Sequence, residues 1–190
     1  MAILLPSANN VSLLVARQVS GSVAAFVAEM NRTARALGMS HTTYTDPSGY
    51  DDGTVSTALD QLRLAKVVAK DETLAAMMAT RSYWLPVAGE VNNTNALLGQ
   101  DGFVGMKTGS DEAAGGCLMF RAVWTAAKGN RSLIGVVLGQ RGDNLLTAGL
   151  SAAKQLADRL GAGEPQLTPP AGAFRPRIEN RIPAGNTPVP

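Results

Sequence analysis

The chain has 190 residues, a formal net charge of +2 and 45% hydrophobic residues, enough for one globular domain with a buried core. Charged residues make up only 17%, and the 17 basic residues are scattered along the chain, so composition does not support a nucleic-acid or membrane-surface role. The single cysteine, Cys117, excludes an intrachain disulfide, and the sequence has no Cys/His cluster that would hold zinc.

The first part of the chain has the apolar spacing of helices. Hydrophobic residues recur every three or four positions, and turn-forming residues separate these repeats. The segment 46–53 contains three aspartates, two glycines and a proline, and this composition predicts an ordered loop of consecutive turns. The predicted helices are a short one over 11–19, one between Gly21 and Gly38, one that begins at Ser56 or Thr57, and one from 71 toward 79.

Beyond Arg81 the pattern changes to strands. The predicted strands cover 82–85, 103–108, 116–127 and 133–138, with a hairpin turn at 127–131 and a closing helix over 144–160. Helices followed by an antiparallel meander predict an α+β domain over residues 1–160, in which Trp84 and Trp124 pack rather than bind a ligand. Seven of the ten prolines lie at or after Pro165, so 161–190 is predicted to be a disordered, Pro-rich tail.

The strand predicted at 133–138 is apolar at nearly every position. Such a strand is normally covered on both faces and flanked on both sides, but its one neighbour in sequence is the strand before it. A long hydrophobic strand at a sheet edge promotes aggregation unless it is covered. We therefore expect another chain segment, a second copy or a partner protein to pair with it.

Two short motifs are candidates for chemistry. A Lys-Thr-Gly tripeptide at 107–109 ends a predicted strand and is followed by Ser110, and a Ser-x-Asn triplet places Ser7 and Asn9 near the start of the chain. Alone, the Lys-Thr-Gly is a moderate signal, because it arises by chance in roughly 4% of chains of this length. The Ser-x-Asn is expected by chance about once in two such chains, so alone it carries no weight. In this order they match two of the three motifs of the active-site serine enzymes that react with penicillin, which combine S-x-x-K, S-x-N and K-T-G.

The residues around the motifs extend this match. From about Leu4 to Leu160 the chain resembles the D-alanyl-D-alanine carboxypeptidase family, the low-molecular-weight penicillin-binding proteins. The resemblance implies the β-lactamase/penicillin-binding-protein-like fold, an antiparallel sheet flanked by helices. It also implies hydrolysis of the terminal D-Ala-D-Ala bond of peptidoglycan stem peptides through an acyl-enzyme on the S-x-x-K serine. The segments that carry the resemblance are 26–31, 36–39, 45–51, 56–58, 105–109, 114–115 and 133–139.

The resemblance also implies roles for the Lys-Thr-Gly strand. Lys107 would direct positive charge toward the terminal carboxylate of the substrate, and Thr108 would hydrogen-bond that carboxylate. Gly109 would let the substrate backbone lie against the strand edge, and the backbone N–H of Ser110 would be one oxyanion-hole donor.

The Ser-x-Asn triplet completes the implied site but also marks a departure from the family. Asn9 would orient the substrate peptide, and Ser7 would relay a proton toward the leaving amine. In complete members the S-x-x-K motif and the first strands of the sheet precede this triplet, which here begins six residues after Met1. We therefore expect the nucleophile to be missing from this chain. The one S-x-x-K in the sequence, Ser151 to Lys154, follows the Lys-Thr-Gly and is predicted to lie near the solvent face of the closing helix, where it would not react.

The sequence thus predicts the C-terminal part of the catalytic domain of a serine D-Ala-D-Ala carboxypeptidase, without metal or organic cofactor and inactive alone. It would react with β-lactams only if the nucleophile were restored. The alternative is a non-catalytic, wall-associated binding or scaffolding protein; a β-lactamase relative fits less well because the sequence between the motifs resembles the carboxypeptidases. The family is extracytoplasmic, yet only four residues separate Met1 from Pro6 and no apolar run approaches roughly 18 residues, so neither a signal peptide nor a transmembrane helix is predicted.

Overall fold

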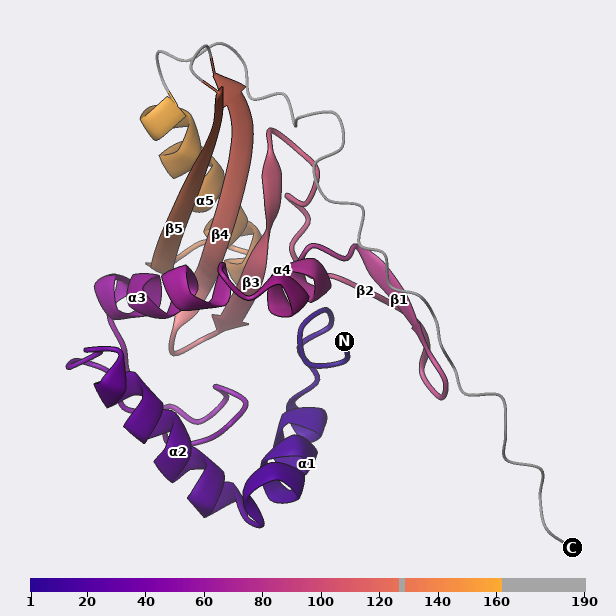
Figure 1. Ribbon diagram of the computed structural model, residues 1–190, viewed down its shortest axis with the longest axis vertical. Helices are drawn as coiled ribbons and strands as arrows, with labels where there is room; N and C mark the ends of the chain where they lie inside the picture. The colour runs from indigo at the N-terminus through magenta and orange to yellow at the C-terminus, as the bar shows by residue number, and fades with distance from the viewer. Residues whose placement is uncertain (127–128, 162–190) are drawn as a thin grey trace, which may run out of the picture.

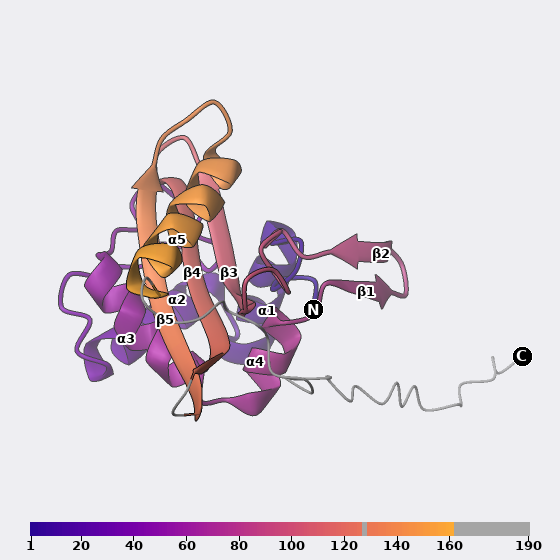
Figure 2. The ribbon, with the colours of Figure 1, turned by 90° about the horizontal axis from the view of Figure 1, so that it is seen from above.

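A three-stranded antiparallel sheet is the centre of the structure (Figure 1). The computed structural model describes residues 1–126 and 129–161. The strands are β3 (Phe103–Asp111), β4 (Gly115–Ala126) and β5 (Gly129–Gln140), in that order across the sheet. The last helix, α5 (Leu145–Gly161), covers one face of the sheet, and α3 (Ala58–Val68) and α4 (Glu72–Met78) lie on the other (Figures 1 and 2).

Two further helices, α1 (Asn9–Ser20) and α2 (Val23–Ala36), precede the sheet and meet at an angle of 86°. Gly21 takes the left-handed conformation between them, with a φ of 77°. Side-chain caps fix the starts of the next helices: Ser22 accepts a hydrogen bond from Ala25 N–H, Thr57 from Asp60 N–H and Asp71 from Leu74 N–H. The predicted helix starts are confirmed to within two residues.

The core lies between the sheet and α5. Phe103, Leu118 and Phe120 of the sheet are buried with Ala153 and Ala157 of α5. Small residues let the helix approach closely. A Cβ on Gly116 would lie 1.9 Å from Leu145 O, and one on Gly149 would lie 2.9 Å from Cys117 N, so neither position has room for a side chain. A second cluster on the opposite face joins α3 and α4 to β3 through Ala65, Met78 and Met106.

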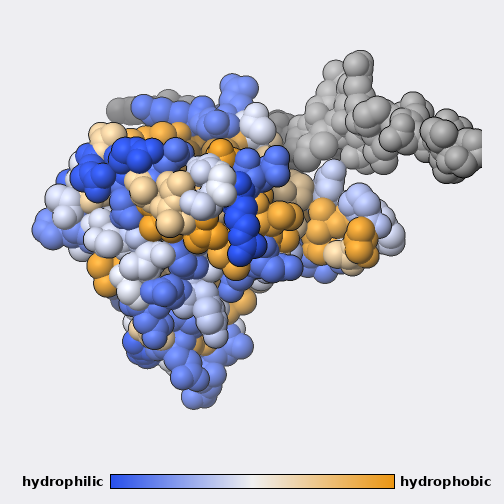
Figure 3. Space-filling view, turned by 90° about the horizontal axis from the view of Figure 1, so that it is seen from below, coloured by the Kyte–Doolittle hydropathy of each residue, from blue (hydrophilic) through white to orange (hydrophobic). Residues whose placement is uncertain are grey.

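A short hairpin projects from this body. It pairs β1 (Ser82–Leu85) with β2 (Gly89–Asn92), and β2 was not predicted from the sequence. Trp84 is 72% exposed and Val87 fully so, and Figure 3 shows hydrophobic residues gathered where the hairpin stands out. The prediction that Trp84 packs is wrong, because its side chain on this hairpin is left largely uncovered by the described residues. The prediction for Trp124, which is 6% exposed on β4, is confirmed.

Several predictions concern the ends of elements. The strand predicted over 82–85 is confirmed with the same bounds, and the one predicted over 116–127 lies one residue earlier. The strands predicted over 103–108 and 133–138 are longer in the structure, and residues 129–131 of the predicted turn belong to β5. The tip of the β4–β5 hairpin at 127–128 lies outside the described residues. The predicted tail also lies outside them, except for Gly161, which ends α5. β5 has β4 as its only strand neighbour in the described part of the chain, as expected from its sequence position.

No single helix within the described ranges has the length and apolar character needed to cross a membrane, although α1 and α2 together pass that criterion as a bent pair. Across the same ranges no three His, Cys, Asp or Glu side chains gather as a group that could hold a metal ion.

Candidate active site

The structure brings the two predicted motifs into direct contact. Lys107 on β3 donates hydrogen bonds from Nζ to Ser7 Oγ and to Thr108 O, the latter at 2.9 Å. Ser7 stands 100 residues earlier in the sequence, in the loop before α1. Its φ of 58° lies in the left-handed region, which a non-glycine residue adopts only when its surroundings hold it there. The serine hydroxyl is therefore held against the lysine by the fold.

Lys107 is a half-buried cation whose hydrogen bonds both go to neutral oxygens. Burial disfavours its charged form and lowers the pKa of the ammonium from 10.5 to about 8. No carboxylate in the described ranges forms an ion pair with it. At neutral pH it is still mainly protonated, so it presents an uncompensated positive charge to any anion that enters.

Two cavities flank the Lys-Thr-Gly strand. Lys107 and Thr108 line one of about 550 Å³, whose opposite wall includes Ser56 and Gln61. Asn9 and Ser110 line another of about 960 Å³. The 46–53 loop borders both, because Gly49 lines the first cavity, and Asp46, Ser48, Tyr50, Asp51 and Asp52 line the second. The predicted site residues thus lie on two sides of one loop.

Gly109 lies between these two groups along the strand. It is exposed, and a Cβ placed on it would make one ordinary contact, 3.7 Å from Cys117 Cβ. Packing within the chain therefore does not require glycine here. β3 pairs with β4 only in the described residues, so its outer edge is open along Gly109, as strand-like binding of a peptide needs.

The 46–53 loop is ordered by its own aspartates, as the sequence predicted. Asp46 accepts hydrogen bonds from the N–H groups of Ser48 and Gly49, each at 2.9 Å, and Asp51 accepts one from Gly53 N–H at 2.8 Å. Burial raises the pKa of Asp46, but the hydrogen bonds from Ser48 and the loop N–H groups outweigh this effect and leave it below the ordinary value of 3.8.

Sequence reasoning missed Asp60, which holds the wall opposite Lys107. Its buried carboxylate accepts hydrogen bonds from His41 N–H at 2.8 Å and from Thr42 Oγ1 at 2.9 Å, and it pairs with Arg63. Burial raises its pKa, but these partners outweigh burial and lower it. The Thr57-x-x-Asp60 pattern has the form of a capping box, which predicts the start of a helix. The pattern gives no indication that the Asp60 carboxylate also binds His41 and Thr42.

The wall itself is a hydroxyl and amide network. Thr42 Oγ1 lies 2.8 Å from Ser56 Oγ, and Gln61 Nε2 donates to Ser56 Oγ at 2.9 Å and to the Tyr44 hydroxyl at 3.1 Å. Because Asp60 fixes Thr42, it also fixes Ser56 and Gln61 where they face the cavity. The acid therefore shapes the cavity without lining it.

The S-x-x-K motif of α5, Ser151 to Lys154, lies away from this site. Lys154 pairs with Asp101 at 2.5 Å and with Asp158 at 3.5 Å, and Ser151 is exposed on α5. Helix α5 lies on the face of the sheet opposite α3, whose Gln61 faces Lys107. The prediction that this pair stands near solvent is confirmed.

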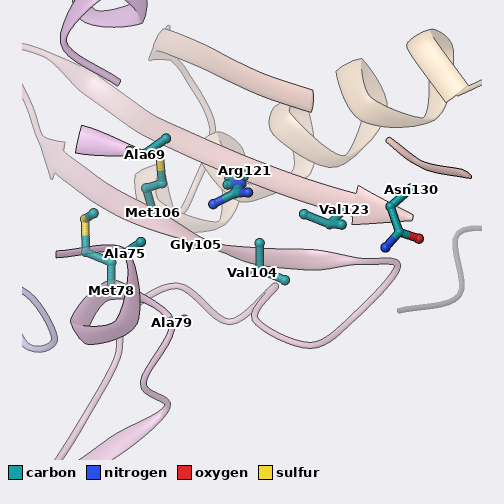
Figure 4. A pocket seen from close by; sticks show the side chains of 10 residues that line it. All are labelled: Ala69, Ala75, Met78, Ala79, Val104, Gly105, Met106, Arg121, Val123 and Asn130. Atoms are coloured by element: carbon teal, nitrogen blue, oxygen red, sulfur yellow. The ribbon is translucent and has the colours of Figure 1, made fainter. Parts of the chain in front are cut away.

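A third cavity, of about 230 Å³, contains none of the predicted site residues. Met78 of α4 and Met106 of β3 form one end of it, Asn130 of β5 lies at the other, and Arg121 stands between them (Figure 4). Most of its other lining residues are alanines and valines. It belongs to the contact of α4 with the sheet and adjoins the Lys-Thr-Gly motif along β3, but no residue of the motif lines it.

The Ser-x-Asn serine and the lysine of the Lys-Thr-Gly edge strand, which the sequence resemblance predicted to share a site, are in contact in this α+β fold. The sequence model of the D-alanyl-D-alanine carboxypeptidase family matches residues 1–142. The chain belongs to this family.

Named relatives agree with this assignment. D-alanyl-D-alanine carboxypeptidase DacF of Bacillus subtilis is 32% identical over 148 residues, which cover 72% of this chain and 36% of the relative. D-alanyl-D-alanine endopeptidase of Escherichia coli is 33% identical over 132 residues, which cover 63% of this chain and 41% of the relative. The chain therefore spans well under half the length of these curated relatives.

Solved structures share the fold. Penicillin-binding protein D2 of Listeria monocytogenes, in its ampicillin-bound form, matches with a TM-score of 0.70 and 30% identity over 83% of this chain and 63% of that one. The DD-transpeptidase of Streptomyces K15 matches with a TM-score of 0.74 and 27% identity over 84% of this chain and 65% of that one.

Proposed function

We propose that this chain forms the substrate-binding part of the active centre of a serine D-Ala-D-Ala carboxypeptidase, which acts on peptidoglycan stem peptides outside the cytoplasm. The contact of Lys107 Nζ with Ser7 Oγ carries the proposal. It unites two motifs that are far apart in sequence at a cavity with an open strand edge. Family membership supports the reaction class, and the relative solved in its ampicillin-bound form supports a ligand site in this fold.

Each side chain has a task suited to its chemistry. Lys107 attracts the terminal carboxylate of the substrate, and Thr108 donates a hydrogen bond to that carboxylate. The peptide lies along the β3 edge at Gly109, where the Ser110 N–H stabilises the developing oxyanion. Asn9 hydrogen-bonds the peptide amide. Ser7, which already accepts a hydrogen bond from Lys107, passes a proton to the leaving amine.

We also propose that the 190-residue chain does not cleave its substrate unaided. The one S-x-x-K in the sequence has its lysine engaged by Asp101 and Asp158, on the far side of the sheet. Ser7 takes the place of the relay serine rather than that of the nucleophile. Without an acyl-enzyme serine, the site binds the peptide but leaves the bond intact.

Two measurements on the purified chain test this proposal. The first is the affinity for acetyl-D-Ala-D-Ala and for its terminal amide, by calorimetry. We expect the chain to prefer the carboxylate form, and Lys107→Ala to abolish the preference. Lys154→Ala is the matched control and should leave it intact, because Lys154 lies away from the site and already has two carboxylate partners. Equal affinity for the two ligands would contradict the proposed carboxylate site.

The second measurement is covalent labelling by a fluorescent penicillin, together with release of D-alanine. We expect neither. Labelling at Ser7 that disappears in Ser7→Ala would show that the Ser7–Lys107 pair is itself the nucleophile and its base. Labelling at Ser151 would show that the S-x-x-K of α5 is reactive. Either result would overturn the proposed inactivity while leaving the carboxylate site standing.

A further inference from the structure

Thr94 lies between the two motifs in space, although neither motif contains it. It follows β2 in the segment that leads to β3. Its N–H and its Oγ1 both donate to Leu5 O, each at 3.2 Å. Its Oγ1 also lies 2.6 Å from Thr108 Oγ1. One residue thus binds both the loop that carries Ser7 and the threonine of the Lys-Thr-Gly strand.

The residues beside Thr94 fix it in place. Asn93 Nδ2 donates to Met78 O at 3.1 Å and to Thr80 O at 3.0 Å, which ties the segment to the end of α4. Asn93 Oδ1 accepts from Asn95 N–H at 2.9 Å, and the buried Asn95 accepts from Leu97 N–H at 3.2 Å. With both neighbours held, the Thr94 side chain has little freedom to turn away from Thr108.

A hydroxyl has one proton to donate, and this limits what Thr108 can do. If Thr94 donates to Leu5 O, the short contact between the two threonines requires Thr108 to donate to Thr94. The Thr108 proton is then unavailable to a ligand. If Thr94 donates to Thr108 instead, the Thr108 proton is free. Leu5 O keeps the hydrogen bond from Thr94 N–H, so this second arrangement strands no carbonyl.

We propose that Thr94 is a positioning residue for substrate binding, which turns its hydroxyl proton from Leu5 O to Thr108 when a carboxylate enters and so makes Thr108 a donor. The proposal rests on the proposed function, because it needs a carboxylate beside Thr108. Both protons stay on their own oxygens, and the two hydroxyls only rotate. The exchange gives up a 3.2 Å bond to a neutral carbonyl and gains a hydrogen bond to a charged group, which is the stronger kind.

The test compares the affinities of acetyl-D-Ala-D-Ala and its terminal amide in three variants. Thr94→Val keeps the shape of the side chain and removes the hydroxyl. It leaves the Thr108 proton free but removes the hydrogen bond from Thr94 that would align the Thr108 hydroxyl with the ligand. We therefore expect it to weaken binding of the carboxylate ligand by about tenfold, with little change for the amide. Thr94→Ser should restore binding, because serine carries the same hydroxyl. Thr125→Val is the matched control: the Thr125 hydroxyl donates to Asn130 Oδ1 at 3.2 Å on the β4–β5 hairpin, outside the contacts that hold Thr94.

A double variant separates positioning from direct contact. Thr94 acts through Thr108, so Thr94→Val/Thr108→Val should bind the carboxylate ligand no more weakly than Thr108→Val alone. Additive losses would overturn the proposal. Should Thr94→Val not fold, Thr94→Ser against Thr94→Ala gives the same comparison of a hydroxyl with none.

The remaining outcomes are distinct. Unchanged affinity in Thr94→Val overturns the inference alone. Equal weakening of both ligands also overturns it, because a merely structural residue would affect the amide as much as the carboxylate. A wild-type chain without preference for the carboxylate ligand overturns the proposed function and this inference together.

Discussion

Lys107 and Ser7 are the two residues for which sequence and structure agree most directly. Their motifs are short, but their order and the surrounding segments indicated the family, and the structure places Nζ against Oγ. Thr94 and Asp60 could not be predicted in the same way. Threonine and aspartate at such positions suit turns and helix caps equally well. Their tasks depend on partners 14 to 89 residues away, which no local pattern encodes.

The lowered pKa of Lys107 gives a prediction about pH. Burial lowers the pKa of the Lys107 ammonium to about 8 in the ligand-free protein. The group is therefore charged below pH 8 and loses its proton as the pH rises above that value. Affinity for acetyl-D-Ala-D-Ala should be nearly constant below about pH 7 and should then fall, approaching a tenfold loss per pH unit. Calorimetry across this range measures the profile.

The control is the variant Lys107→Ala. Its affinity for acetyl-D-Ala-D-Ala should be weak and should not change with pH. An affinity of the wild-type chain that stays constant far above its lysine pKa would show that another group supplies the charge. The same ligand with its carboxylate amidated should show no such pH dependence, because its binding does not use the ammonium.

Among the elements, the helices were predicted better than the strands. Caps such as Thr57 and Asp71 are local signals, and they marked the true starts. The hairpin strand β2 has four residues, two of them glycine and asparagine at its ends, which leaves too few positions for an alternating pattern. Trp84 was misplaced for the same reason, because an unrecognised hairpin cannot be seen to project.

The close packing of α5 on β4 gives a prediction at this scale. In Gly116→Ala the new Cβ would meet Leu145 O at 1.9 Å and Gly149 N at 2.8 Å, both of which are backbone atoms that cannot move alone. We expect a loss of about 2–3 kcal/mol in the free energy of unfolding, as for overpacked cores. Thermal and urea unfolding measure the loss.

Gly161→Ala is the matched control for that variant. Its Cβ would have no neighbour within 4 Å among the described residues. We expect its stability to stay within about 0.5 kcal/mol of wild type. A tolerated Gly116→Ala would mean that α5 is not held against β4 as closely as the structure shows.

The whole molecule has an unpaired edge at β5 and another at β3 in its described part. The sequence predicted the first, because the 133–138 segment is too apolar for an exposed edge strand. The sequence did not show which strand pairs with this edge, because pairing between strands that are far apart in the chain produces no local sequence pattern. We propose that a strand from a second copy or from another segment pairs with β5.

Association of the purified chain should therefore increase with concentration, as measured by light scattering. Ser132→Lys places a charge on an exposed position of β5 and should reduce the apparent mass. Ser151→Lys adds the same charge on exposed α5 and should not. A monomer at every concentration, with two-state unfolding, would contradict the prediction.

The Ser7–Lys107 contact also links recognition to the integrity of the entire domain. Its two residues are 100 positions apart, in the loop before α1 and on β3, so the chain between them must fold back before the ammonium meets the hydroxyl. A partly unfolded molecule has no site to offer. A carboxylate ligand that binds only the folded state stabilises that state by mass action. Ligand binding at this site is therefore coupled to the folding stability of the domain.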